Sequence, residues 1–132
     1  MILDTSAAVP LLFDHELSDV ARRMLSGQSL ASPALVGVET ANALWKYAMR
    51  DGLTALQLAE MVSSLTEIVE IVPDAQLMSR AVELAVEHRH PVYDCLYLAL
   101  AVQRREPLAT ADRRLAALAR QLSIETELIE PA

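Results

Sequence analysis

The chain has 132 residues, of which 53% are hydrophobic and only 4% aromatic, and its formal net charge is −7. This length predicts a single domain covering residues 1–132, and the negative charge argues against broad electrostatic attraction to nucleic acid or anionic membranes, although metal-binding acids would also count as negative. No apolar run approaches the roughly 20 residues that span a bilayer, no secretory signal is evident, and the single Cys95 fits a reducing compartment, so we expect a cytoplasmic protein without a membrane segment.

The N-terminal half alternates short strands with helices. Apolar spacing and helix-breaking residues predict, in chain order, a strand at 1–3, helices at about 6–13 and 15–26, a strand at 29–31, and helices at about 33–50 and 54–66. We expect Ser32 to cap the third helix, with Pro33 as its first residue and Gly52 at its end. Thr54 and Gln57 match a capping box at the start of the fourth.

The C-terminal half continues the alternation. The pattern predicts a strand at 67–72, a helix from 73 to about 88, a very apolar helix that starts at Pro91, a strand at 107–110, a helix at about 112–121 and a strand at 124–129. This alternation indicates a layered α/β fold with a mainly parallel sheet. Ligand sites in such sheets lie at the carboxyl ends of the strands, where Asp4 and the stretch 110–112 are expected.

Four of the eighteen acidic residues differ from the rest by their context. Asp4 follows the first strand, Glu39 lies in PALVGVETANAL, Asp94 in VYDCLYLALA and Asp112 in LATADRRL. Each has a structural alternative: Asp4 and Asp112 suit helix caps, Asp94 suits the positive end of a helix dipole, and Glu39 suits an exposed polar stripe. Together they indicate a metal site, because a buried carboxylate is costly without a compensating cation. An all-carboxylate cluster favours Mg²⁺ or Mn²⁺ over Zn²⁺.

Other chemistries find less support in the residues. His15, His88 and His90 are expected in exposed, loop-like positions without metal-ligand spacing. Cys95 has no evident base and is expected in the core. The three glycines form no dinucleotide-binding or P-loop pattern. A phosphatase of the haloacid dehalogenase type would need a second acid two residues after the first. Like a receiver domain, it would also need a lysine at the site, for which Lys46 is a poor candidate.

Four stretches, taken in order, resemble the motifs of the PIN-domain ribonucleases, and especially the VapC-type toxins of toxin–antitoxin pairs. They are MILDTSA, ETANAL, YDCLYLALA and LATADRRL. The resemblance covers nearly the whole chain and implies a three-layer α/β/α PIN-like fold. It implies that Asp4, Glu39, Asp94 and Asp112 are catalytic, with the three aspartates binding metal. The residues that would support these acids are Thr5, Ser6, Asn42 and Thr110. Some relatives carry a further acid where this chain has Leu115, so the number of metal ions stays open.

The resemblance also implies an activity and partners. The activity is Mg²⁺-dependent hydrolysis of RNA phosphodiesters by metal-activated water, with Glu39 either holding that water or acting as the base. The partners are a second copy in a homodimer and a cognate antitoxin that covers the site, for which the apolar helix faces within 33–66 offer surface. The alternative is a catalytically inactive PIN-like module that binds RNA or protein.

Several side chains are candidates for RNA contacts. The candidates for phosphate contacts are Arg104, Arg105, Arg113 and Arg114, although a solvated helix face explains them as well. Trp45 and Tyr93 are candidates for base stacking. Because Trp45 shares a helical spacing with several apolar residues, we expect it in the core instead.

Overall fold

Five short parallel strands form the centre of the fold. The computed structural model describes all 132 residues, and its sheet has the strand order β3-β2-β1-β4-β5, with every neighbouring pair parallel. The strands are β1 (Ile2–Leu3), β2 (Leu30–Pro33), β3 (Val69–Val72), β4 (Leu108–Thr110) and β5 (Thr126–Leu128). The expected parallel sheet of short strands is confirmed.

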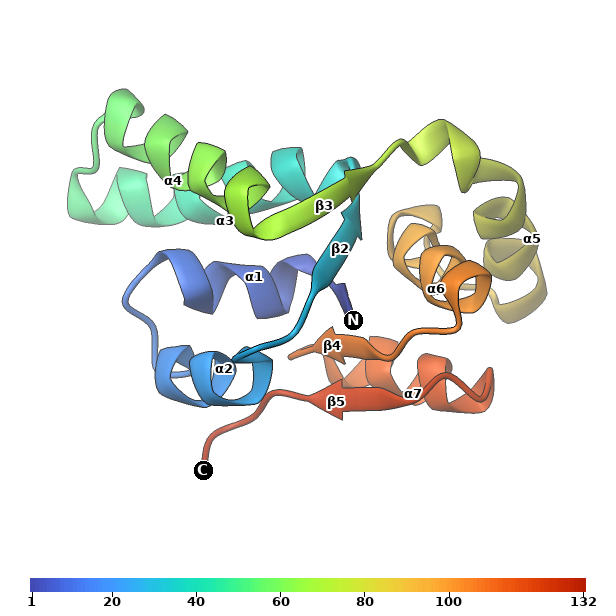
Figure 1. Ribbon diagram of the computed structural model, residues 1–132. Helices are drawn as coiled ribbons and strands as arrows, with labels where there is room; N and C mark the ends of the chain where they lie inside the picture. The colour runs from blue at the N-terminus through green and yellow to red at the C-terminus, as the bar shows by residue number, and fades with distance from the viewer.

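Helices cover both faces of this sheet, as Figure 1 shows. One group lies on the left in that view and consists of α1 (Thr5–Leu12), α2 (Ser18–Leu25), α3 (Leu35–Asp51) and α4 (Ala55–Ile68). The group on the right consists of α5 (Met78–His88), α6 (Val92–Arg104) and α7 (Arg113–Gln121), and a short 3₁₀ turn, η1 (Asp74–Gln76), precedes it. The fold is therefore the three-layer α/β/α arrangement that the sequence predicts. None of these helices combines the length and hydrophobicity that crossing a bilayer requires.

The central strand β1 has only two residues, and both are fully buried. Ile2 lies opposite Ala31 of β2 on one side and Leu108 of β4 on the other. The pairing continues to the next residue, since the backbone N–H of Asp4 donates to the carbonyl of Ala109 (3.2 Å). The strand thus places the first acid at the carboxyl end of the sheet.

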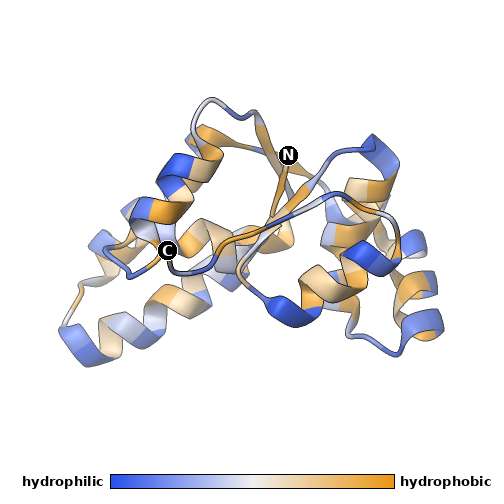
Figure 2. Ribbon diagram, turned by 90° about the horizontal axis from the view of Figure 1, so that it is seen from below, coloured by the Kyte–Doolittle hydropathy of each residue, from blue (hydrophilic) through white to orange (hydrophobic).

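Small and branched aliphatic side chains fill the core, where 29 buried residues form one cluster. Tyr97 is the one aromatic residue among the largest fully buried side chains, and the free thiol of Cys95 is buried as expected. Figure 2 shows hydrophobic residues on the strands and on helix faces between the two groups of helices. This distribution is what amphipathic helices packed on a sheet produce.

The prediction that Ser32 and Pro33 start a helix is wrong. Both residues belong to β2, where Ser32 lies opposite Ile71 of β3 and its hydroxyl donates to the carbonyl of Leu3. The helix α3 begins at Leu35, and the backbone N–H of Leu35 donates to Asp74 Oδ1 (3.0 Å). The cap therefore comes from a distant segment, while strand pairing uses the residues that resemble a cap.

Other boundaries differ by a few residues. Glu67 and Ile68 finish α4 instead of starting the strand, and the helix expected from 73 is a 3₁₀ turn followed by α5. Two local signals hold: Gly52 ends α3 with a left-handed backbone (φ +77°), and Thr54 with Gln57 forms the predicted capping box. Local signals are kept where no tertiary contact competes with them.

Candidate active site

A cavity of about 700 Å³ opens at the carboxyl ends of β1 and β4. All four acids singled out in the sequence line it: Asp4 before α1, Glu39 in α3, Asp94 in the first turn of α6 and Asp112 before α7. Parallel strands place their carboxyl ends at one edge, and the helices that follow begin there. The structure therefore brings together acids that are more than 100 residues apart in the sequence.

Asp4 is the most buried of the four, with 6% of its surface exposed. Its Oδ1 accepts hydrogen bonds from Ser6 Oγ (2.8 Å) and from the Ala7 N–H (3.2 Å), and its Oδ2 accepts one from Thr110 Oγ1 (3.0 Å). Burial, with a smaller contribution from the charge of Asp112, raises the pKa of Asp4 to about 7 in spite of these bonds. Asp4 is thus both a helix cap and a carboxylate without a compensating cation.

Asp112 caps α7 in the same way that Asp4 caps α1. Its Oδ1 accepts from the backbone N–H groups of Arg114 (2.9 Å) and Leu115 (3.2 Å), and its own N–H donates to Thr110 Oγ1 (3.0 Å). Ser6 Oγ joins the two caps, because it donates to Asp4 and accepts from the Ala111 N–H (2.8 Å). Ser6 and Thr110 thus each donate to Asp4 and each accept from a backbone N–H, of Ala111 and Asp112 respectively.

Glu39 is held from one side by two hydroxyl groups. Thr5 Oγ1 (3.0 Å) and Tyr97 Oη (2.6 Å) both donate to its Oε1. Burial, and secondarily the hydrogen bond to Glu39, raises the pKa of Tyr97, so this phenol stays protonated as a donor. Tyr97 is a site residue that the sequence patterns do not single out, because it lies in the very apolar helix that follows Asp94. Its spacing of three residues from Asp94, which places the two on one helix face, was the available signal.

Asp94 is paired with a histidine that the sequence analysis assigned to the surface. His90 Nε2 lies 2.7 Å from Asp94 Oδ2, and the imidazole is only 10% exposed. The His90 backbone N–H donates to the carbonyl of Ala85 (3.1 Å), which anchors the residue to the end of α5. The expectation of an exposed His90 is wrong because the turn between α5 and α6 directs the side chain toward the start of α6. The spacing of four residues between the two was the missed signal.

Three of the acids share one pattern of hydrogen bonding. In each, one carboxylate oxygen makes hydrogen bonds within the protein and the other makes none. The oxygens without a partner are Oε2 of Glu39, Oδ1 of Asp94 and Oδ2 of Asp112. No three His, Cys, Asp or Glu side chains converge closely enough to hold a metal ion by themselves. This donor set suits a hard cation that keeps several waters and uses few carboxylates, which is the habit of Mg²⁺.

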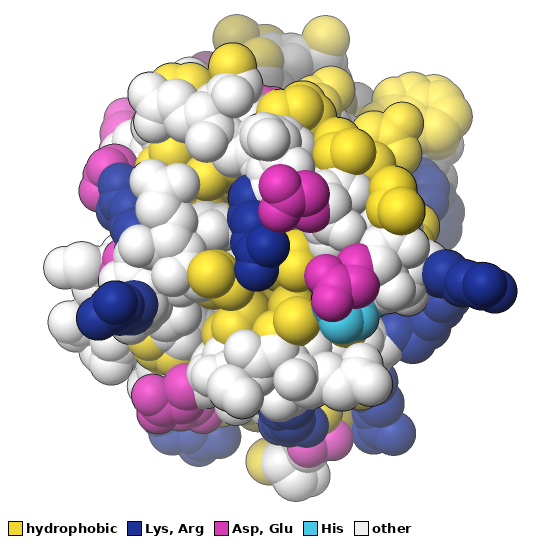
Figure 3. Space-filling model, turned by 90° about the vertical axis from the view of Figure 1, so that its right-hand side faces the viewer, with side chains coloured by type: hydrophobic (Ala, Val, Ile, Leu, Met, Phe, Trp, Pro, Cys, Tyr) yellow, Lys and Arg dark blue, Asp and Glu magenta, His cyan; other side chains and the backbone are white.

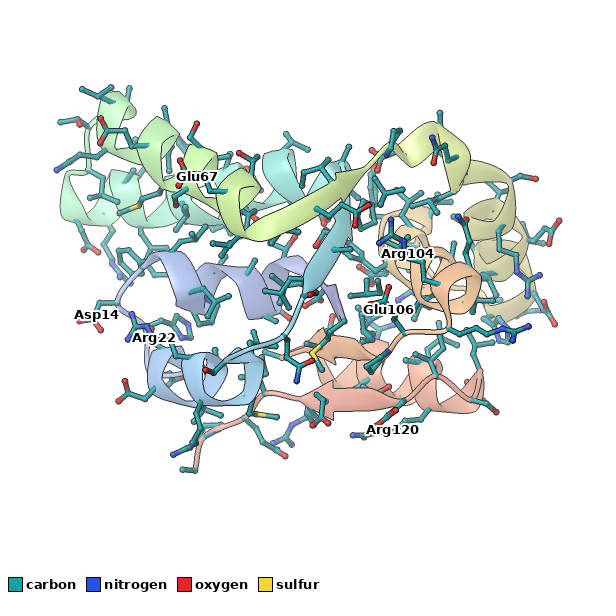
Figure 4. The ribbon with its side chains drawn as sticks, in the orientation of Figure 1. Asp14, Arg22, Glu67, Arg104, Glu106 and Arg120 are labelled. Carbon is teal, nitrogen blue, oxygen red and sulfur yellow. The ribbon has the colours of Figure 1, made fainter.

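Not every predicted site residue is near the cavity. Asn42 is exposed on α3 and does not line it. Arg104 lies ten residues from Asp94, about 15 Å along α6. There it forms ion pairs with Glu70 and, at 3.9 Å, with Glu106, and Figure 4 shows Arg104 and Glu106 close together where α6 leads into β4. Arg105 ends the same helix, so the structure does not support phosphate contacts by this pair at the site.

Arg113 and Arg114 directly follow Asp112 as the first residues of α7, but neither lines the cavity, and Arg113 contacts Glu130 (3.3 Å). The core position expected for Trp45 is wrong, since this side chain is 50% exposed. Tyr93 is 64% exposed beside Asp94 and stays a candidate for base stacking. Besides Tyr97, four other cavity residues with polar side chains were not predicted as site residues: His15, Lys46, Tyr47 and Arg50.

Comparisons with known proteins agree with this geometry. Residues 1–121 match the family model of the PIN domain. Among curated proteins, the chain is similar to Ribonuclease VapC3 of Pyrobaculum aerophilum, with 35% identity over 120 residues that cover 88% of this chain and 92% of that relative.

Two solved structures show the same fold at lower identity. One is PAE2754 from Pyrobaculum aerophilum, with a TM-score of 0.72 and 22% identity, covering 95% of this chain and 81% of that one. The other is a toxin–antitoxin complex from Klebsiella pneumoniae, with a TM-score of 0.67 and 21% identity, covering 88% of this chain and 89% of that one.

Proposed function

Because the chain belongs to the PIN-domain family of VapC ribonucleases and is thus a nuclease, we propose that it is a Mg²⁺-dependent endoribonuclease and the toxin of a toxin–antitoxin pair. One observation carries this proposal: four carboxylates from distant parts of the chain line one cavity, and none of them pairs with an arginine or a lysine. A binding scaffold would have no reason to keep a buried, uncompensated carboxylate such as Asp4.

We assign Asp4, Asp94 and Asp112 to a Mg²⁺ or Mn²⁺ ion, with bound water bridging where the carboxylates do not converge closely enough for direct contact by all three. When bound, the cation supplies Lewis-acid activation of water and neutralises charge on the phosphate. The caps of α1 and α7 hold Asp4 and Asp112 through backbone N–H groups, so neither carboxylate depends on a flexible rotamer for its position. A site with few direct ligands leaves coordination positions for water and for phosphate oxygens.

We assign Glu39 as the general base that accepts a proton from the attacking water. Thr5 and Tyr97 fix Oε1 by hydrogen bonds, and Oε2 is left to accept a proton. Because the raised pKa of Tyr97 keeps its proton on the phenol, the tyrosine orients Glu39 without competing as a base.

The proposed homodimer and antitoxin complex are supported by exposed apolar surface on two faces. On one face, Ala41 of α3 and Leu58, Ala59 and Val62 of α4 line a shallow groove of about 440 Å³. Trp45, Met49 and Leu56 are exposed on the same two helices. On another face, Val82 and Val86 of α5 are exposed, and Figure 3 shows hydrophobic side chains there among charged ones. Light scattering of the chain alone and with its antitoxin would measure both associations.

The decisive test compares the parent with Asp94→Asn. RNA ends are sequenced after expression of each, and cleavage of the mapped sites is repeated with purified protein with and without Mg²⁺. We expect discrete new ends only with the parent, and cleavage that EDTA stops. Asp14→Asn is the matched control, because Asp14 is an exposed acid outside the cavity. Equal cleavage by the parent and Asp94→Asn would refute the metal-site assignment.

The inactive PIN-like module gives a different outcome in the same experiment. It would produce no RNA ends, and its thermal midpoint would not respond to Mg²⁺. For the proposed enzyme, Mg²⁺ binds the folded state and raises the midpoint with concentration.

A further inference from the structure

The cavity continues beyond the four acids along α3. His15, Lys46, Tyr47 and Arg50 line this extension, and the cavity as a whole, at about 700 Å³, is far larger than one metal-bound phosphate needs. Lys46 lies seven residues after Glu39, about 10.5 Å farther along the same face of the helix. The cavity therefore has room for a longer substrate that passes from the acids into this extension.

Two of these side chains are already engaged with neighbours. Arg50 forms two hydrogen bonds to Asp51 (3.0 and 3.1 Å), and its guanidinium lies 5.0 Å from the centre of the Tyr47 ring. The Tyr47 ring also packs on Phe13, with ring centres 4.5 Å apart. The Tyr47 ring thus already has an aromatic and a cationic neighbour within the protein. Lys46 differs from them, because this only lysine of the chain makes no hydrogen bond or ion pair.

His15 has a defined tautomer. Its Nδ1 accepts a hydrogen bond from the Leu17 N–H (3.0 Å), so this nitrogen carries no proton and Nε2 does. The loop is fixed by the buried Ser18, whose hydroxyl accepts from the His15 N–H (2.9 Å) and donates to the carbonyl of Phe13 (3.0 Å). His15 Nε2–H has no partner within the protein. The extension thus offers two free donors, one of them cationic.

We propose that Lys46 Nζ and His15 Nε2–H bind the RNA phosphate next to the one that is cleaved. This inference rests on the proposed ribonuclease function. It adds a substrate contact that determines which phosphodiester of the RNA lies at the acids. Single-stranded RNA carries a charge at every nucleotide, whereas the chain has a net charge of −7 and the cavity holds four acids. A metal would compensate one phosphate only, so the next one needs its own cation.

The test neutralises the two partners separately. A cleavable RNA oligonucleotide is made with a neutral methylphosphonate at each flanking position in turn, and cleavage is measured for the parent and Lys46→Gln. We expect Lys46→Gln to raise KM about 10-fold with little change in kcat, because a charge-assisted hydrogen bond is lost. At one of the flanking positions, the methylphosphonate should raise the KM of the parent by the same factor as Lys46→Gln does. It should cause no further rise in the KM of Lys46→Gln. Arg120→Gln, an exposed cation on α7, is the control and should match the parent.

Additive losses from the methylphosphonate and Lys46→Gln, or a fall in kcat at constant KM, would overturn the proposal. A second measurement does not need cleavage: NMR of labelled histidine, titrated with a nucleoside 3′,5′-bisphosphate at fixed pH. We expect the His15 ring signals, assigned with His15→Gln, to shift in the parent and much less in Lys46→Gln. No shift in the parent would refute the subsite, whereas a shift in a parent that cleaves no RNA would refute only the proposed function.

Discussion

Acidic residues lie at both ends of the strands of the parallel sheet, called here the amino edge and the carboxyl edge. Their charge is compensated by cationic groups at the amino edge but not at the carboxyl edge. At the amino edge, Glu106 pairs with the N-terminal amine of Met1 (2.6 Å), and Arg104 forms ion pairs with both Glu70 and Glu106. At the carboxyl edge, Asp4 and Asp112 have backbone and hydroxyl donors but no cationic side chain.

This difference distinguishes a structural cluster from a functional one. The charge of an acid that pairs with arginine is already compensated within the protein. A buried acid that has only neutral hydrogen-bond donors has no such compensation, so a bound cation would stabilise its ionised form. The pKa shifts follow the same division: that of Glu70 is lowered by Arg104, and that of Asp4 is raised by burial.

Asp4→Asn should reduce RNA cleavage by about 10³-fold, because metal assistance contributes several kcal/mol to such reactions. The fold should persist, since the amide keeps an oxygen that can cap α1 for the Ala7 N–H. Single-turnover cleavage and circular dichroism measure the two effects. Cleavage at the parent rate by a folded Asp4→Asn would show that the carboxyl edge is not the active site.

Asp4 should also make the stability depend on pH. In the unfolded chain this carboxyl ionises near 3.8, whereas in the folded chain its pKa is about 7, so the folded state binds more protons between these values. The free energy of unfolding should therefore fall as pH rises from about 4 to 7, by roughly 3 kcal/mol for a shift of this size. Urea unfolding at several pH values should show this fall in the parent and not in Asp4→Asn.

Mg²⁺ provides the control for that experiment. At pH 7.5, where Asp4 is ionised, Mg²⁺ should restore stability to the parent because it binds only the folded site. Asp4→Asn should gain much less. Equal gains would mean that the cation binds elsewhere on the surface.

His90→Ala should lower cleavage by about 10-fold and raise the Mg²⁺ concentration for half-maximal activity, because it removes the group that orients Asp94. His90→Gln can still donate to the carboxylate and should recover most of the loss. Mg²⁺ binding by calorimetry gives a readout independent of turnover. If His90→Gln and His90→Ala were equally impaired, the imidazole would have a role other than holding Asp94.

Arg104→Gln, at the amino edge, should have the smallest effect. It breaks exposed ion pairs, which contribute little to stability, and it lies far from the cavity along α6. Cleavage should equal that of the parent, and the thermal midpoint should change only slightly. A loss of cleavage would show that the two edges are functionally coupled.

The sequence alone determined the features that depend on neighbouring residues. The capping box at Thr54, the left-handed Gly52 and the two aspartate caps follow from residue type and local backbone geometry. The meeting of the four acids was also predictable, because parallel strands and their following helices bring Asp4 and Asp112 to one edge.

Only the tertiary structure decided the hydrogen-bond partners of several individual side chains. Ser32 looks like a helix cap but pairs within the sheet, and the cap of α3 comes from Asp74 instead. The turn before α6 buries His90 against Asp94, and the length of α6 carries Arg104 away from the site. Residue type sets what a side chain can bind, but the free energy of packing and strand pairing selects its partner from the rest of the chain.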